Sequence, residues 1–220
     1  MNLLCGAAAI VCALRFGDLS GAFCWLVLAA VFDFCDGLSA RLLHIPSPLG
    51  IQLDSLADDI SFGLAPGAVL YTLCLRMPGL WLGEWAAWGA FLFSACAALR
   101  LAKFNVDDTQ HTEFCGLPTP AATLLCTSVA LLAERDALCL MREWVLVLAV
   151  VTALLMISPV RMFSLKFKGF GWQGNELRYL FLLLACLLLA GLGAYGVPVI
   201  VAGYVLISTV RWLAARNQEE

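Results

Sequence analysis

Apolar segments of membrane-spanning length recur along the whole chain, and they limit the fold more than any other feature. A helix needs about 20 apolar residues to cross a hydrocarbon core about 30 Å thick. Because lipid offers no hydrogen-bonding partners, the backbone inside it must pair with itself, as it does in a helix. The sequence therefore predicts an all-α, polytopic integral membrane helix bundle of about eight transmembrane helices. The expected spans are residues 3–17, 21–43, 54–75, 83–106, 118–134, 143–161, 177–192 and 196–213.

The composition excludes several other classes of protein. Hydrophobic residues make up 62% of the 220 residues, charged residues make up 13%, and the mean hydropathy is +0.91. A soluble domain carries about 25% charged residues and could not cover so much apolar surface. We therefore expect one membrane domain over residues 1–220, with no soluble domain attached and no cleavable signal peptide. The net charge of −3 gives no basic field that would indicate nucleic-acid binding.

Four aspartates interrupt the apolar sequence in two closely spaced pairs. Asp33 and Asp36 are three residues apart, and the second pair, Asp54 and Asp58, are four apart. On helices, each spacing puts both carboxylates on one face, and a short loop between the helices lets the two pairs meet. Acidic pairs are often solvated or salt-bridged, but ionisable groups flanked by membrane-type apolar runs are usually functional. Four convergent oxygen ligands are typical of a site for Mg²⁺ or Mn²⁺.

The acidic pairs are part of a longer pattern, D-x2-D-G-x2-A-R-x8-G-x3-D-x3-D. This pattern resembles the signature of the CDP-alcohol phosphotransferase family, integral membrane enzymes that make phospholipids. The matching residues are Asp33, Asp36, Gly37, Ala40, Arg41, Gly50, Asp54 and Asp58. The resemblance implies that the four aspartates bind two divalent cations and that Asp58 is the catalytic base. It also implies a cytidine-diphosphate pocket beside Asp36 that is bordered by Gly37, Ala40, Arg41 and Gly50.

The residues around the second acidic pair narrow the resemblance. Residues 53–66, LDSLADDISFGLAP, resemble the phosphatidylserine synthase branch, in which LDSLAD is followed by SFGxAP. The glycerol-phosphate branch usually reads LDPxADK, and this chain has Ser55 and Asp59 at the differing positions. The resemblance implies transfer of the phosphatidyl group from CDP-diacylglycerol to the hydroxyl of L-serine, with release of CMP. It also implies a homodimer in contact with membrane lipid.

Two basic residues lie near the end of the fourth expected span. Arg100 and Lys103 share one helix face, and the sequence around them, RLAKFN followed by GLPTP, also resembles the serine branch. Lys103 replaces the more common arginine of that branch. Two cations at this boundary could bind a diphosphate or a carboxylate, or they could anchor the helix by reaching lipid headgroups.

The basic residues also predict an orientation, because cytoplasmic loops are rich in lysine and arginine. With both termini in the cytoplasm, nine basic residues are inside and four are outside. Those inside are Arg41, Arg100, Lys103, Arg161, Lys166, Lys168, Arg178, Arg211 and Arg216, and those outside are Arg15, Arg76, Arg135 and Arg142. We therefore expect a protein of the cell's inner membrane whose active site faces the cytoplasm.

Two other functions stay open at this point. The nearer one is a member of the same family with another acceptor, such as glycerol 3-phosphate or an inositol phosphate; an archaeal-type lipid donor is a further variant. The more distant one is a divalent-cation transporter, which would need carboxylates deep in the bilayer and a path to both faces. The four aspartates are instead expected near one face of the membrane.

Overall fold

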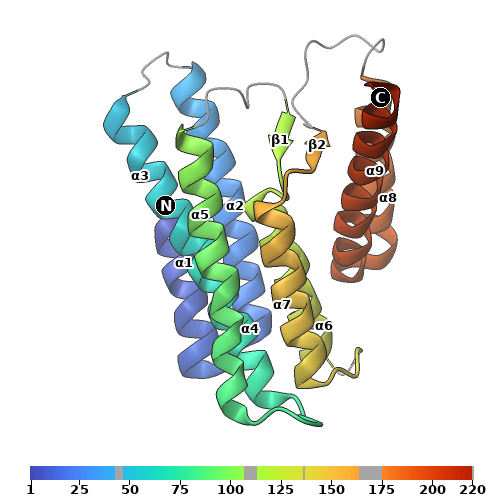
Figure 1. The fold of residues 1–220 in the computed structure, drawn as a ribbon. Coiled ribbons are helices and arrows are strands. Elements are labelled where there is room, and N and C mark those ends of the chain that lie inside the picture. The colour runs from blue at the N-terminus through green and yellow to red at the C-terminus, as the bar shows by residue number, and fades with distance from the viewer. Residues whose placement is uncertain (43–46, 107–112, 136, 164–174, 220) are drawn as a thin grey trace.

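The computed structural model of the protein describes residues 1–42, 47–106, 113–135, 137–163 and 175–219. Figure 1 shows helices that run side by side along one axis, with two short strands near one end of the bundle. The helices are α1 (Asn2–Val11), α2 (Leu19–Leu42), α3 (Pro48–Asp58), α4 (Ala65–Arg76), α5 (Leu92–Val106), α6 (Thr119–Glu134), α7 (Arg142–Ile157), α8 (Glu176–Leu192) and α9 (Gly196–Glu219). The strands are β1 (Glu113–Cys115) and β2 (Arg161–Phe163).

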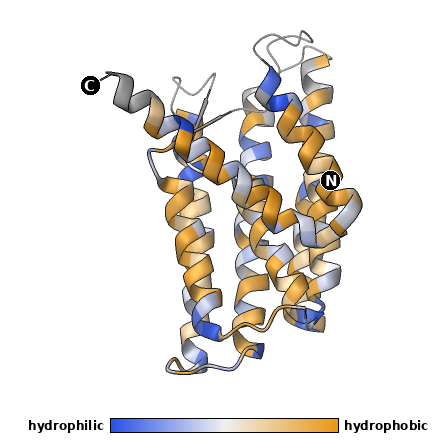
Figure 2. Cartoon of the chain, turned by 90° about the vertical axis from the view of Figure 1, so that its right-hand side faces the viewer, coloured by the Kyte–Doolittle hydropathy of each residue, from blue (hydrophilic) through white to orange (hydrophobic). Residues whose placement is uncertain are grey.

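Each of the eight expected apolar segments contains a helix, which confirms the mostly helical architecture. Within the described residues, three stretches are long and apolar enough to cross a membrane: Leu19–Ser39, Glu84–Val106 and Arg178–Ala214. The expectation of about eight crossings therefore stays a prediction. Hydrophobic residues dominate the middle of the helices, and hydrophilic residues gather toward the two ends of the bundle (Figure 2).

The fold is mostly helical, as expected, but it also contains two short strands: β1 and β2 pair as an antiparallel two-stranded sheet with Phe114 opposite Met162. This sheet can form because α7 ends early and leaves the following residues in an extended conformation. This helix stops at Ile157 because Pro159 disfavours a helical conformation at the residue before it, and Ser158 is extended, with a ψ of 153°. The chain then continues in an extended form toward β1.

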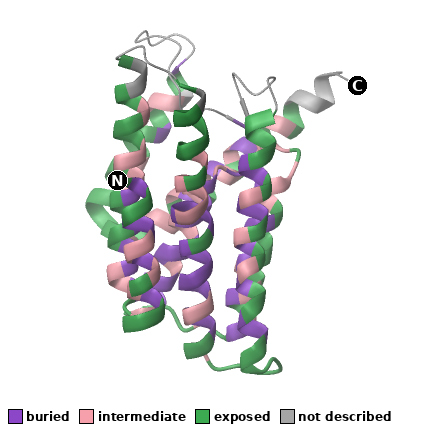
Figure 3. Cartoon of the chain, turned by 90° about the vertical axis from the view of Figure 1, so that its left-hand side faces the viewer, coloured by how far each residue is buried: buried purple, intermediate pink, exposed green. Residues whose placement is uncertain are grey.

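Buried side chains concentrate in the lower part of the bundle, whereas the upper ends of α2 and α3 are mostly exposed (Figure 3). In the buried part, α1 and α6 pack against α2, and α7 packs against α4 and α5. The hairpin of α8 and α9 contacts this group mainly where α9 packs against α6. The exposed upper ends leave room for a site between α2 and α3.

The helices α3 and α4 form one continuous segment that is interrupted by a π-helical turn, Asp59–Leu64. A π-helical turn leaves backbone groups without their usual helical partners. The carbonyl of Gly63 in this turn accepts a hydrogen bond of 2.9 Å from the Ser94 hydroxyl of α5. At the other end of α3, the Ser47 side chain caps the helix by accepting from the Gly50 N–H at 3.0 Å.

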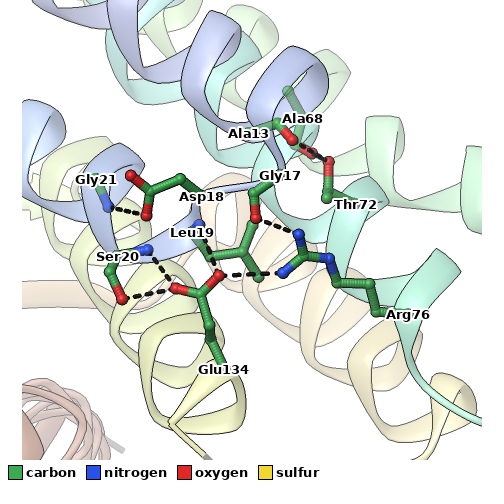
Figure 4. Close-up of polar contacts among 10 residues, drawn as sticks. All are labelled: Ala13, Gly17, Asp18, Leu19, Ser20, Gly21, Ala68, Thr72, Arg76 and Glu134. Atoms are coloured by element: carbon green, nitrogen blue, oxygen red, sulfur yellow. Dashed lines mark hydrogen bonds and ion pairs between the residues drawn. The ribbon is translucent and has the colours of Figure 1, made fainter.

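At the lower end of the bundle, Glu134 of α6 caps the start of α2 (Figure 4). Its carboxylate accepts from the backbone N–H groups of Leu19 at 3.0 Å and Ser20 at 2.6 Å, and from the Ser20 hydroxyl at 2.6 Å. Arg76 of α4 pairs with the same carboxylate at 3.1 Å and also donates to the carbonyl of Gly17. Because unpaired N–H groups begin every helix, this carboxylate fixes where α2 starts relative to α4 and α6.

Candidate functional site

The upper ends of α2 and α3 bring together three of the four aspartates. Asp33 and Asp36 of α2 and Asp54 of α3 each offer one carboxylate oxygen, and these oxygens all lie within 4.8 Å of one another. Asp33 is partly buried, and the other two are exposed. The two helices thus meet at their acidic faces, as their spacing led us to expect.

Asp58, the fourth aspartate, ends α3 one turn beyond Asp54 and lies outside this group of three. Its partly buried carboxyl group is close enough to Asp33 for the two to share a hydrogen bond. It also accepts a hydrogen bond of 2.7 Å from the side-chain amide of Asn2, the first residue of α1. Asn2 was not among the residues that the sequence indicated; the only signal was a polar residue at the start of an apolar helix.

The surroundings of the four aspartates favour a cation rather than a salt bridge. Among the described side chains, no lysine or arginine lies within ion-pairing distance of any of them; the ion pair found is that of Arg76 and Glu134, at the far end of the bundle. Ionised carboxylates this close repel one another, and a divalent cation relieves that repulsion. A set of oxygen donors from two helices fits Mg²⁺ or Mn²⁺.

A first hollow, of about 500 Å³, opens beside the acidic residues between the start of α1, α2 and α3. Asp36 and Asp54 line it together with Gly37 and Gly50, the two glycines of the motif. Because neither glycine carries a side chain, a ligand can approach the backbone closely at both positions. The side chains of Ala40 and Arg41, near the end of α2, lie outside the described part of the structure.

A second hollow, of about 290 Å³, lies on the α5 side of α3. Asp54 and Asp58 line it from α3, Arg100 and Asn105 from α5, and Thr119 from the start of α6. Asp54 therefore lines both hollows, so the acidic residues lie between them. This arrangement would place one ligand on each side of the carboxylates.

Arg100 is the buried cation of the second hollow, with 7% of its surface exposed. Its Nη1 donates to the Thr119 hydroxyl at 3.2 Å, and its guanidinium lies 5.9 Å from the centre of the Phe104 ring. Among the described residues, its Nε has no hydrogen-bonding partner and no carboxylate lies within 4.0 Å. Burying a charge without a counterion is costly, so this side chain is suited to an anionic ligand.

Lys103 has a different location from Arg100. Its side chain is exposed and lines a third hollow, of about 570 Å³, between α5, β1 and the end of α7. Arg100 also lines this hollow, so the two cations share it, but Lys103 does not line the second hollow with the aspartates. Asn105, two residues further on, donates to the Ser55 hydroxyl at 2.9 Å and so ties α5 to α3.

Comparison of the sequence with known proteins finds one matching family and several similar proteins. The profile of the CDP-alcohol phosphatidyltransferase family matches residues 1–155. Three similar proteins are each named CDP-diacylglycerol–serine O-phosphatidyltransferase. The one from Bacillus subtilis is 35% identical over 122 residues, which are 55% of this chain and 66% of that protein. The one from Mycobacterium bovis is 35% identical over 131 residues, covering 56% of this chain and 44% of that protein.

The third relative extends the likeness along almost the whole chain. This protein, from Methanocaldococcus jannaschii, is 30% identical over 213 residues, covering 96% of this chain and 91% of its own length. The match thus spans less than two thirds of the Bacillus and Mycobacterium proteins, but nearly all of the Methanocaldococcus protein.

Proposed function

We propose that this chain, which belongs to the CDP-alcohol phosphatidyltransferase family, transfers the phosphatidyl group of CDP-diacylglycerol to the hydroxyl of L-serine and releases CMP. One observation carries the proposal: carboxylates from two helices converge between a hollow lined by glycines and a hollow lined by a buried arginine. The reaction needs a nucleotide diphosphate on one side of the reacting atoms and an acceptor alcohol on the other. The printed names of the relatives support the same activity.

We propose that two divalent cations, Mg²⁺ or Mn²⁺, bind between the carboxylates of the acidic residues. The side chains that would hold them are Asp33, Asp36, Asp54 and Asp58. When bound, such cations neutralise the diphosphate and make CMP a better leaving group. The donor set supports this assignment, because hard oxygen ligands suit these ions, whereas zinc prefers cysteine and histidine.

Asp58 is the proposed catalytic base. A serine hydroxyl is a weak nucleophile because its proton is lost only far above neutral pH, so it needs a neighbouring base. Asp58 lines the second hollow and can take that proton as the serine oxygen attacks. The oxygen forms a bond to the phosphorus that carries the lipid. The bond from this phosphorus to CMP breaks, and its electron pair leaves with CMP.

The second hollow supports serine as the acceptor. It presents the Arg100 guanidinium, which can bind a carboxylate, together with acceptor oxygens of Asp54 and Asn105, which can bind an ammonium group. A zwitterion that also carries a hydroxyl matches all of these groups. Glycerol 3-phosphate and inositol phosphates lack the ammonium group and would bring a doubly charged phosphate toward the aspartates, which disfavours this alternative.

The first hollow is proposed to hold the cytidine diphosphate. Gly37 and Gly50 line it, and Ala40 and Arg41 follow on α2 at positions that match the family signature. Its volume of about 500 Å³ is within the range of ordinary ligand pockets. Lys103, in the third hollow with Arg100, is the second cation proposed to attract an anionic part of a substrate.

The family and the three long apolar stretches make this a membrane protein. We further propose that the acidic residues face the cytoplasm from the inner membrane. In Figure 1 the ends of α2 and α5, both strands and the end of α9 lie at the upper end of the bundle, and the ends of α1, α4 and α6 lie at the lower end. The elements that carry most basic residues are therefore at the upper end, which supports that orientation. The homodimer stays a prediction from the resemblance.

The test is CMP release by the purified protein with CDP-diacylglycerol, Mn²⁺ and one alcohol at a time. We expect release with L-serine and none above background with glycerol 3-phosphate, inositol phosphate or no alcohol. Release with another alcohol in place of L-serine would show that this alcohol is the acceptor. Absence of release with every alcohol, together with Mn²⁺ flux into protein-containing vesicles, would instead support the transporter alternative.

A further inference from the structure

Asn2 is a buried polar residue that the proposed reaction does not yet use. Although it is the first residue of α1, only 2% of its surface is exposed. Its side-chain Nδ2 donates to Oδ1 of Asp58 at 2.7 Å, across 56 residues of sequence. Burying an amide costs free energy unless its hydrogen bonds are replaced, and the bond formed here is to one carboxylate oxygen of the proposed base.

The backbone of Asn2 is fixed as firmly as its side chain. Its carbonyl accepts a hydrogen bond of 3.0 Å from the hydroxyl of Ser61, which is fully buried in the π-helical turn after Asp58. One turn along α1, a Cβ added to Gly6 would lie 2.7 Å from the Cα of Ser61, so the two segments are in direct backbone contact. The start of α1 is thus held against the segment that carries Asp58.

The side-chain oxygen of Asn2 shows which way the amide faces. Within the described residues, Oδ1 is buried and has no hydrogen-bonding partner. The reverse orientation would point this oxygen at a carboxylate oxygen, where both are acceptors and repel. The contact with Asp58 therefore decides the orientation of the amide.

We propose that Asn2 is a positioning residue for Asp58, an inference that rests on the proposed function. By holding Oδ1, the amide stops rotation of the carboxyl group. The other oxygen then stays at the boundary between the acidic residues and the second hollow, which Asp58 lines. Such outer contacts typically change activity by about 10- to 100-fold when they are removed.

The experiment replaces Asn2 with leucine, which has a similar shape but no donor. A hydrogen bond that orients the base acts on the chemical step and adds little to substrate binding. We therefore expect Asn2→Leu to lower kcat by about 10- to 100-fold and to leave the KM values for serine and CDP-diacylglycerol within about threefold. If Asn2→Leu does not yield folded protein, Asn2→Ser, whose hydroxyl is too short to reach Asp58, should give the same pattern.

A matched control separates positioning from simple packing. Cys5 lies on the same helix, is 4% exposed and packs with Ala29 and Phe62. Cys5→Ala should lower the thermal unfolding midpoint in detergent while leaving kcat within about twofold. The inference is wrong if a folded Asn2 variant keeps wild-type kcat, if its main effect is on KM, or if Cys5→Ala loses as much kcat. The assay uses whichever alcohol the wild type accepts, so a different acceptor would change the proposed function and leave this test intact.

Discussion

Asp33 of α2 and Asp54 of α3 bring carboxylate oxygens within 4.8 Å of each other across the connection between the two helices. Neither has a basic partner among the described side chains. Two like charges at this separation repel, and the packing of the helices alone must hold them together unless a cation is bound.

Removal of divalent ions should stop the reaction. We expect EDTA in excess to abolish CMP release and added Mn²⁺ or Mg²⁺ to restore it, because the diphosphate charge would otherwise remain unneutralised. Recovery of CMP release would show that EDTA had removed the ion and had not unfolded the protein. Full activity in EDTA would rule out the metal site.

Asp58→Asn should lower kcat by about 10²- to 10⁴-fold, because an amide cannot take the serine proton. Binding of CDP-diacylglycerol, measured as a Kd on the detergent-purified protein, should stay within about threefold. Asp59→Asn is the control, since Asp59 is the next residue but does not line the second hollow. If Asp58→Asn turned over at the wild-type rate, another group would have to be the base.

Arg100→Ala should raise the serine KM by about 10- to 100-fold, the range for losing a hydrogen bond to a charged group. The exposed Arg15, in the π-helical turn that follows α1, provides a control for removing one arginine. Arg15→Ala should change neither KM nor kcat. An unchanged serine KM in Arg100→Ala would favour the alternative in which Arg100 only anchors its helix.

Glu134→Ala should destabilise the fold without affecting the chemistry. It removes four hydrogen bonds that join the start of α2 to α4 and α6, and we expect a loss of about 2 kcal/mol. The measurement is the thermal unfolding midpoint in detergent, with kcat recorded well below it. Asp18→Ala, which removes one exposed bond of 2.7 Å to the Gly21 N–H, should cause a smaller shift. Equal shifts would contradict the capping role of Glu134.

The sequence was most informative for features that are determined within one short segment of the chain. The three- and four-residue spacings within 33–58 are helix spacings, so the shared faces of the aspartates could be predicted before the structure was known. The apolar segments likewise located the helices, since the period and length of a buried helix are properties of the segment itself. The expected span 143–161 extends four residues past the end of α7 at Ile157, because Pro159 disfavours a helical conformation at Ser158.

Contacts between distant segments could not be predicted in this way. The pairing of β1 with β2 depends on two three-residue stretches, too short to carry a clear strand pattern. The bonds from Asn2 to Asp58 and from Arg100 to Thr119 join residues far apart in sequence, and they exist only once the helices have packed. The division between the second and third hollows, by which Arg100 lines both and Lys103 lines only the third, also depends on that packing.

The π-helical turn Asp59–Leu64 makes the geometry of the acidic residues sensitive to chain length. Each residue of a helix advances its neighbours by about 100° around the axis. Shortening this turn by a single residue would therefore rotate α3 against α4 by roughly a quarter of a circle and carry Asp54 away from α2. Relatives that share this chemistry should tolerate substitutions within the turn far better than gaps.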